Sequence, residues 1–302
     1  MSKLLQALFV LILIIFTAHA DSITHGSTTI NMEFVNIGYE GNMADSTGYG
    51  AVGYNYRIGK LEVTIDQFMK ARAVDSRISN GNEDYWNDGI HTVGINAPAS
   101  KVTWYEATMF ANWLTTGDAY MGVYQFDGGG TLTGLDRSCR NGNDMAYVLP
   151  TEDEWYKAAY YKPINDGSYS LYASGLDSTP VQGTTDGWNY NGVLSSPNVL
   201  WETGYGAEEQ NGTFDMNGNV YEWNESASDG TLDDMEELRV IRGGAGGDTE
   251  DILRSSTRLH DYPSNELNSV GFRVVAIPEP SSVVLMGMAG VFTLLARKKT
   301  RR

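Results

Sequence analysis

The chain has 302 residues, a net charge of −17 and a single cysteine, Cys139. One cysteine excludes an intrachain disulfide framework, and the strong acidity disfavours binding to nucleic acid or to an anionic membrane surface. His25, His91 and His260 lie far apart without zinc-binding spacing, whereas the acidity suits hard cations.

The first 20 residues have the pattern of a signal peptide. Lys3 supplies the positive charge that a signal peptide carries before its apolar core. Leu4–Phe16 forms an almost unbroken apolar core, and Ala18-His19-Ala20 fits a signal peptidase site. We therefore predict cleavage before Asp21. The alternative is a retained anchor helix, for which the apolar core is short. Residues 21–277 contain no Pro/Ser linker or charge block that would divide them, so they are expected to form one domain.

Strand and helix signals alternate in the first half of this domain. Residues 54–60 alternate in hydropathy and run into residues 61–63, which predicts a strand. Two capping boxes, Thr64–Gln67 and Thr103–Glu106, each predict the start of a helix. The first helix is expected to reach about Val74. The second carries a core-facing stripe at three- and four-residue steps: Trp104, Ala107, Ala111 and Leu114.

The second half is richer in loops. A third capping box, Thr151–Glu154, begins a helix that Pro163 should end, and residues 164–237 contain no convincing long element. Three further strands are predicted: Ala146–Leu149, Leu238–Arg242 and Gly271–Ala276. The pattern favours a loop-rich α+β fold.

The C-terminal 25 residues combine three signals. Pro278-Glu279-Pro280 precedes an apolar run of 16 residues, 281–296, and a basic end. This segment resembles the PEP-CTERM sorting tail through which an exosortase delivers proteins of Gram-negative bacteria to the surface. The resemblance implies an exported protein of the cell surface or extracellular (biofilm) matrix, anchored transiently in the inner membrane by the tail alone. The alternative is an ordinary membrane anchor, although a permanent span needs about 20 apolar residues. Without both ends, 15 basic and 37 acidic residues remain, a net charge of −22.

The body of the chain resembles the sulfatase-modifying-factor domain, the fold of formylglycine-generating enzyme, which is related in architecture to the C-type lectins. The resemblance covers roughly residues 50–276 and implies that α+β fold. Its motifs occur in the family's order: Arg57–Thr64, Pro98–Trp113, Leu149–Trp155, Phe214–Trp223, Arg242–Gly244 and Gly271–Val274.

The segment from Asp215 to Glu222 is the best candidate metal site. Calcium takes six to eight oxygen ligands from carboxylates and backbone carbonyls, and an Asn-Gly turn within the segment can bring its ends together. The family resemblance implies calcium ligation by the side chains of Asp215 and Glu222 and by the carbonyls of Gly218 and Val220. It also implies a second site near Asn189. The alternative is a hairpin turn with two solvated carboxylates.

The same resemblance argues against the family's oxidation chemistry. Formylglycine-generating enzymes hold copper with two cysteines that follow the Gly-Gly of the penultimate strand, and those positions fall on Asp248 and Leu253. Soft Cu(I) requires thiolate ligands, so copper is not expected. Cys139 lies far along the chain and supplies only one thiol. No catalytic residue is assigned.

Two classes of function remain. The first is a non-catalytic, calcium-ordered scaffold that binds a surface protein or a polysaccharide. Trp86, Trp188 and Trp201 are its candidate sugar-stacking residues, the alternative being that they pack beneath loops. The second is an oxidoreductase or protein-modifying enzyme that uses a non-standard site on the same fold. A redox-active metal in the purified protein would favour the second class.

Overall fold

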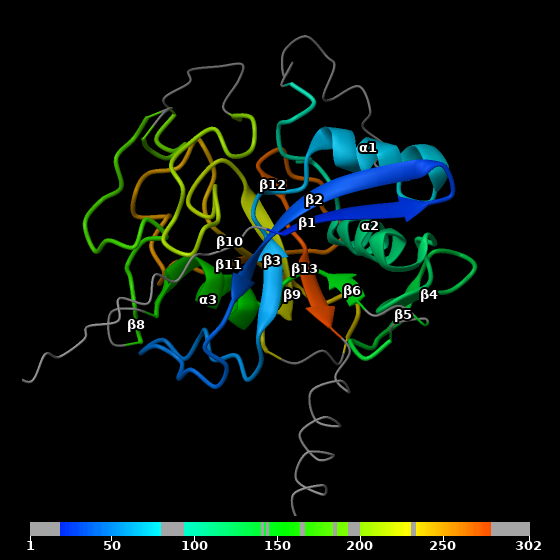
Figure 1. The fold of residues 1–302 in the computed structure, drawn as a ribbon, viewed down its shortest axis with the longest axis horizontal. Helices are drawn as coiled ribbons and strands as arrows, with labels where there is room; N and C mark the ends of the chain where they lie inside the picture. The colour runs from blue at the N-terminus through cyan, green and yellow to red at the C-terminus, as the bar shows by residue number, and fades with distance from the viewer. Residues whose placement is uncertain are drawn as a thin grey trace, which may run out of the picture.

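A five-stranded antiparallel sheet, in the order β1-β2-β3-β13-β6, crosses the middle of the computed structural model (Figure 1). A second sheet has the order β11-β10-β9-β12, and β4–β5 and β7–β8 form separate hairpins. The structure describes residues 19–79, 94–139, 142, 145–163, 167–183, 186–192, 200–230 and 234–278. In chain order the elements are β1 (His19–His25), β2 (Thr28–Ile37), β3 (Tyr56–Gly59), α1 (Ile65–Val74), α2 (Trp104–Thr116), β4 (Tyr124–Phe126), β5 (Leu132–Leu135), β6 (Met145–Val148), α3 (Glu152–Tyr160), β7 (Tyr161–Lys162), β8 (Ser168–Tyr169), β9 (Tyr221–Ala227), β10 (Arg239–Arg242), β11 (Leu259–Asp261), β12 (Val270–Gly271) and β13 (Val275–Pro278).

All three predicted helices are present, and each begins with the predicted capping box. Thr64, Thr103 and Thr151 each accept a hydrogen bond from the backbone three residues later, and the side chain of that later residue accepts one from the threonine N–H. α3 ends at Tyr160, before the predicted stop at Pro163, because Tyr161 and Lys162 pair with β8.

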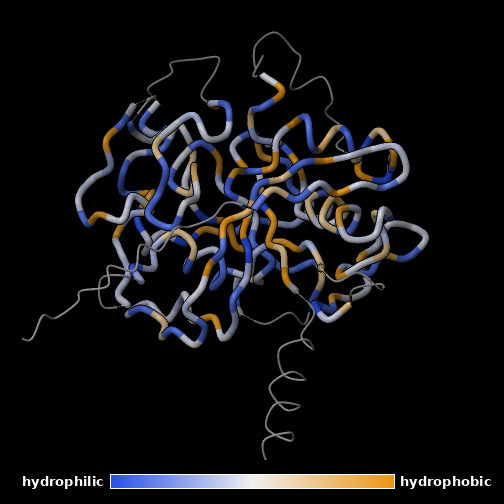
Figure 2. The backbone as a smooth tube through the Cα atoms, in the orientation of Figure 1, coloured by the Kyte–Doolittle hydropathy of each residue, from blue (hydrophilic) through white to orange (hydrophobic). Residues whose placement is uncertain are grey.

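The hydrophobic core lies where the five-stranded sheet, α1 and α2 meet. Phe68 of α1 packs against Phe110 of α2 and against Phe272, with ring centroids 5.8 and 6.3 Å apart. Apolar segments accordingly concentrate at the centre of the molecule, whereas the peripheral loops are hydrophilic (Figure 2). The four largest apolar side chains that are fully buried are Trp104, Trp113, Trp155 and Trp223.

Three strand predictions need correction. The expected strand 271–276 is two strands, β12 and β13, which belong to different sheets. The region 164–237 contains the seven-residue strand β9, whose buried polar residues hide it from a hydropathy pattern. The β1–β2 hairpin, which the sequence analysis did not predict, supplies two strands of the central sheet.

The predicted signal peptide core and most of the sorting tail lie outside the described residues. Within the part of the chain that the structure describes, no helix has both the length and the apolar composition needed to cross a membrane. Cleavage before Asp21 remains a prediction.

Candidate functional site

The predicted calcium loop is a tight turn whose backbone conformation depends on Gly218. Gly218 has a φ of +90°, and Asp215 and Asn219 have φ values of +61° and +58°. A Cβ atom at position 218 would overlap the carbonyl oxygen of Asn189. That carbonyl accepts a hydrogen bond from the Asn219 N–H at 2.9 Å. The structure therefore brings Asn189 against the loop, a contact that the sequence analysis did not predict.

Glu222 has a partner that the sequence analysis missed. Arg273 donates from Nε to Oε2 and from Nη2 to Oε1 of Glu222, each at 2.6 Å, and Trp155 Nε1 donates to Oε2 at 2.8 Å. Both Glu222 and Arg273 are completely buried. Glu222 is therefore one half of a bidentate ion pair, whereas the carboxylate of Asp215 accepts from the Gly204 N–H at 2.7 Å.

Buried carboxylates outnumber buried cations around this loop. Glu62, Glu209 and Asp215 are each at least 95% buried, and all three feel the charge of Arg273, which already pairs with Glu222. Burial raises the pKa of Glu209 to about 7 and that of Asp215 to about 6. Burial, together with the charges of Asp215 and Glu222, raises the pKa of Glu62 well above its usual value. This acidic cluster must therefore take up protons or a cation.

The buried carboxylates around the loop favour a bound cation in one respect and disfavour it in another. The buried Glu62 Oε1 has no hydrogen-bond partner, and the excess of carboxylates leaves negative charge uncompensated. Glu222, however, already directs both oxygens at Arg273. In the described ranges, no three carboxylate, thiol or imidazole groups converge as a metal site. A calcium ion here would rely on Asp215 and backbone carbonyls more than the sequence indicated.

The positions of the family's copper-binding cysteines have structural roles in this chain. Leu253 is completely buried and packs in a small cluster with Tyr172 and Tyr190. Asp248 accepts a hydrogen bond from the Ala245 N–H at 2.9 Å and another from the Tyr221 hydroxyl. Neither residue supplies the soft ligand that Cu(I) requires, so these two positions do not fit copper.

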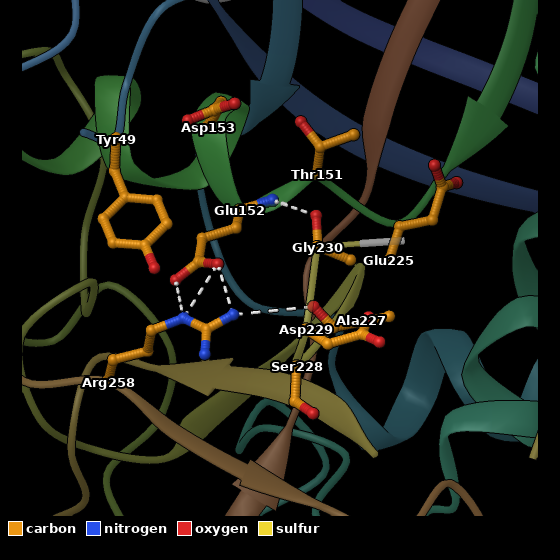
Figure 3. Close-up of a pocket in the computed structure, with 11 residues that line it drawn as sticks. Tyr49, Thr151, Glu152, Asp153, Glu225, Ala227, Ser228, Asp229, Gly230 and Arg258 are labelled. Atoms are coloured by element: carbon orange, nitrogen blue, oxygen red, sulfur yellow. Dashed lines mark hydrogen bonds and ion pairs between the residues drawn. The ribbon is translucent and has the colours of Figure 1, made fainter. Parts of the chain in front are cut away.

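A cavity of about 240 Å³ lies beside the N-terminus of α3 and the end of β9 (Figure 3). Glu152 forms one wall, held between two arginines. Arg258 Nε lies 2.8 and 3.0 Å from its two oxygens, and Arg242 Nε lies 2.9 Å from Oε1. Arg258 thus contacts both oxygens of Glu152, a contact that the sequence analysis did not identify.

The remaining walls of the cavity combine polar residues with Tyr49, Ala227 and Gly230. Tyr49 lies on one side in Figure 3, and Asp153, Ser226 and Ser228 contribute polar atoms. The Ser226 hydroxyl accepts from the Glu152 N–H at 2.9 Å. The lining offers hydrogen-bond donors, acceptors and an aromatic ring, which suits binding of a small polar group.

The two candidate sugar-stacking tryptophans that the structure describes, Trp188 and Trp201, pack against other side chains. Trp201 is only 4% exposed and packs edge-on against Tyr205 at 6.0 Å. Trp188 is partly buried against the cluster of Tyr172, Tyr190 and Leu253. Trp86 lies outside the described residues. For Trp188 and Trp201, packing beneath loops is therefore the better interpretation.

Comparison with known proteins identifies the domain and the tail separately. A family model described as the sulfatase-modifying factor enzyme 1-like domain matches residues 23–277, and the PEP-CTERM protein-sorting motif matches residues 276–302. The chaperone protein LppX of Paenibacillus barcinonensis is 24% identical over 225 residues, which are 66% of this chain and 73% of LppX.

Three solved structures share the fold. CarF has a TM-score of 0.58 at 21% identity and covers 81% of this chain and 97% of its own. Treponema denticola variable protein 1 has a TM-score of 0.54 at 18% identity, covering 86% and 99% of the two chains. PvdO from Pseudomonas aeruginosa has a TM-score of 0.51 at 17% identity, covering 85% and 97%. With a family match over most of its length, the chain belongs to the sulfatase-modifying factor enzyme 1-like family and carries a PEP-CTERM sorting motif.

Proposed function

We propose that this chain, which its PEP-CTERM motif marks for export and surface sorting, is a scaffold that binds a surface protein or polysaccharide and does not generate formylglycine. The observation that carries the proposal is the burial of Leu253 at a position where the family's oxidases have a copper-binding cysteine. An apolar side chain packed against Tyr172 and Tyr190 replaces a metal ligand with structural packing. The fold is retained while this part of its chemistry is lost.

A formylglycine assay tests the absence of oxidation. Residues 21–277, incubated with copper, oxygen and a sulfatase-type cysteine peptide, should leave the peptide unconverted when it is analysed by mass spectrometry. A family member that has both cysteines serves as the positive control under the same conditions. Conversion by the wild-type chain would contradict the proposal and support the alternative of an enzyme with a non-standard site.

The cavity of Figure 3 is the place where we propose that the scaffold binds a polar group of its partner, such as a sugar ring. Its support is that Tyr49, Asp153 and Ser228 all line one cavity of about 240 Å³. Aromatic rings and paired polar groups are the features with which proteins hold polar ligands of this size.

Filling this cavity should abolish binding while leaving the fold intact. Ser228→Tyr would place an aromatic ring in the cavity, whereas Ser264→Tyr places the same ring on an exposed turn that does not line it. On an array of bacterial polysaccharides and surface proteins, Ser228→Tyr is expected to reduce binding at least about tenfold, the loss of roughly 1.4 kcal/mol of binding free energy. Equal binding by both variants would place the partner elsewhere on the surface.

Calcium is the second part of the proposal. Asp215 and Glu222, with the carbonyls of Gly218 and Val220, would hold one ion, which would supply positive charge to the acidic cluster around Arg273. Asn189 would belong to a second calcium site. The excess of buried carboxylates supports this assignment, and the ion pair between Glu222 and Arg273 is its main competitor. Stability measured with calcium and with a chelator distinguishes the two.

A further inference from the structure

The sorting motif begins inside the folded domain. The PEP-CTERM match starts at residue 276, and β13 continues to Pro278. Ala276 pairs with Arg57 of β3 on one side and with Tyr147 of β6 on the other. Ile277 pairs with Ala146, and Pro278 lies opposite Met145. The first three residues of the motif are therefore part of β13, which pairs with β6 at all three residues and with β3 at Ala276 (Figure 1).

Burial reinforces this pairing. Ala276 is completely buried, and Ile277 is only 7% exposed. A segment that an enzyme recognises in extended form must offer its backbone N–H and C=O groups to that enzyme. Pairing with β6 covers all three residues, and pairing with β3 covers Ala276, so one edge of this backbone, and at Ala276 both edges, are already engaged by the sheet. An enzyme that binds this segment along the edge paired with β6 therefore requires β13 to leave the sheet.

An ion-pair bridge crosses β13 at the residue where the motif begins. Arg57 donates from Nη1 and Nη2 to the two oxygens of Asp21, each at 2.8 Å, and the Tyr147 hydroxyl donates to Oδ2 at 2.9 Å. Residues directly opposite each other in antiparallel strands project to the same face. Because Arg57 and Tyr147 are the two cross-strand neighbours of Ala276, the Asp21 carboxylate joins β3 to β6 across β13. We call these three residues the Asp21 bridge.

The bridge also links the two ends of the chain. Asp21 belongs to β1, the edge strand of the same sheet, and it would become the first residue of the mature chain after the predicted signal-peptide cleavage. The small side chain of Ala276 leaves room for the carboxylate above it. The N-terminal strand thus stabilises the strand from which the sorting tail leaves.

We propose that the Asp21 bridge holds the start of the sorting motif in the central sheet, so that the exosortase engages only chains in which the end of β13 has left that sheet. Sorting then acts before the N-terminal strand has docked, or during transient opening of β13. The docked bridge protects chains that have already folded from further engagement. The inference depends on the sorting motif and the sheet, and it is independent of which ligand the domain binds.

Sorting kinetics of the full chain test this coupling. The chain would be expressed with its cognate exosortase, pulse-labelled, and followed as the fraction delivered to the cell surface. Asp21→Asn weakens the charge-assisted bonds to Arg57 and should speed sorting about tenfold, the factor that corresponds to a loss of about 1.4 kcal/mol. Tyr147→Phe removes one hydroxyl far from the signal peptide and should speed sorting by a smaller factor.

Two controls separate the bridge from general destabilisation. Asp66→Asn removes the carboxylate of an exposed pair with Lys70 on α1 and should leave the rate unchanged. The N-terminus of each variant, read by mass spectrometry, shows whether signal-peptide cleavage is unaltered. Sorting of both Asp21→Asn and Tyr147→Phe at the wild-type rate would overturn the proposal.

A reversible disulfide between β6 and β13 should slow sorting, whereas the substitutions in the Asp21 bridge should speed it. Ala146→Cys with Ile277→Cys, in a Cys139→Ser background, places cysteines at paired positions of β6 and β13. Once oxidised, this pair should stop sorting, and dithiothreitol should restore it. The same background without the new pair should be sorted at the wild-type rate. Sorting of the oxidised, locked chain at that rate would show that β13 need not leave the sheet, and the proposal would fail.

Discussion

Replacing Arg273 with methionine is expected to lower the free energy of unfolding by about 3–5 kcal/mol, the usual cost of breaking a buried ion pair from one side. Arg273 holds both oxygens of Glu222 at 2.6 Å and also donates to the carbonyls of Gly59 and Phe214. Methionine fills part of the volume but leaves Glu222 charged and unpaired. Urea unfolding at pH 7 measures the loss.

Lys70→Met is the matched control for this substitution. It removes a cation from an exposed i,i+4 pair with Asp66 and should change stability by less than about 0.5 kcal/mol. A loss below about 1 kcal/mol for Arg273→Met would mean that another cation compensates Glu222, and the ion-pair interpretation of this residue would be wrong.

The second large effect is a rise in stability as pH falls, seen only when calcium is removed. The ordinary pKa values of Asp215 and Glu209 are 3.8 and 4.5, and burial raises them to about 6 and about 7 in the folded chain. Between about pH 4 and pH 7 the folded state therefore binds more protons than the unfolded state, so its stability falls as pH rises. Over this window the two groups should contribute about 2–5 kcal/mol, at 1.36 kcal/mol per pKa unit.

Calcium should abolish most of this dependence, because the ion would take the place of the protons. At pH 8, calcium at 100 times its dissociation constant should stabilise the chain by about 2.7 kcal/mol, whereas at pH 5 it should have little effect. Thermal melting of residues 21–277 at several pH values, in calcium and in chelator, makes the comparison.

Asp215→Asn is the variant of choice for the calcium test. The amide keeps an oxygen for the Gly204 N–H and removes the charge, without stranding Arg273 as a Glu222 substitution would. This variant should lose the calcium effect and part of the pH effect together. Identical melting of the wild type in calcium and chelator at pH 8 would refute the calcium site and leave protonation as the way in which the acidic cluster is stabilised.

The parts of the fold that the sequence predicted well are those decided by neighbours along the chain. A capping box needs only a threonine and a residue three positions later, so all three helix starts could be located without tertiary information. The Asn217-Gly218 turn is equally local, because glycine tolerates the positive φ required there.

Strands were harder to predict because their pairing depends on distant segments. β9 carries Glu222, Asn224 and Glu225, all buried, so polar residues break the apolar pattern expected of an interior strand. These side chains are acceptable there because partners far along the chain satisfy them: Arg273 for Glu222, and the Tyr124 hydroxyl for Glu225 at 2.7 Å.

The sequence by itself determined the family, the exported class with its sorting tail, the helix starts and the lack of a copper-binding cysteine pair, since each depends on residue identity at a fixed spacing. Only the tertiary structure decided that Glu222 faces Arg273, that Leu253 packs in an apolar cluster, and that Asp21 bridges the strand at which the sorting motif begins. Asp21 lies 36 positions from Arg57 and 126 positions from Tyr147, and Glu222 lies 51 positions from Arg273. Their geometry is set by how the sheets assemble, which no local pattern encodes.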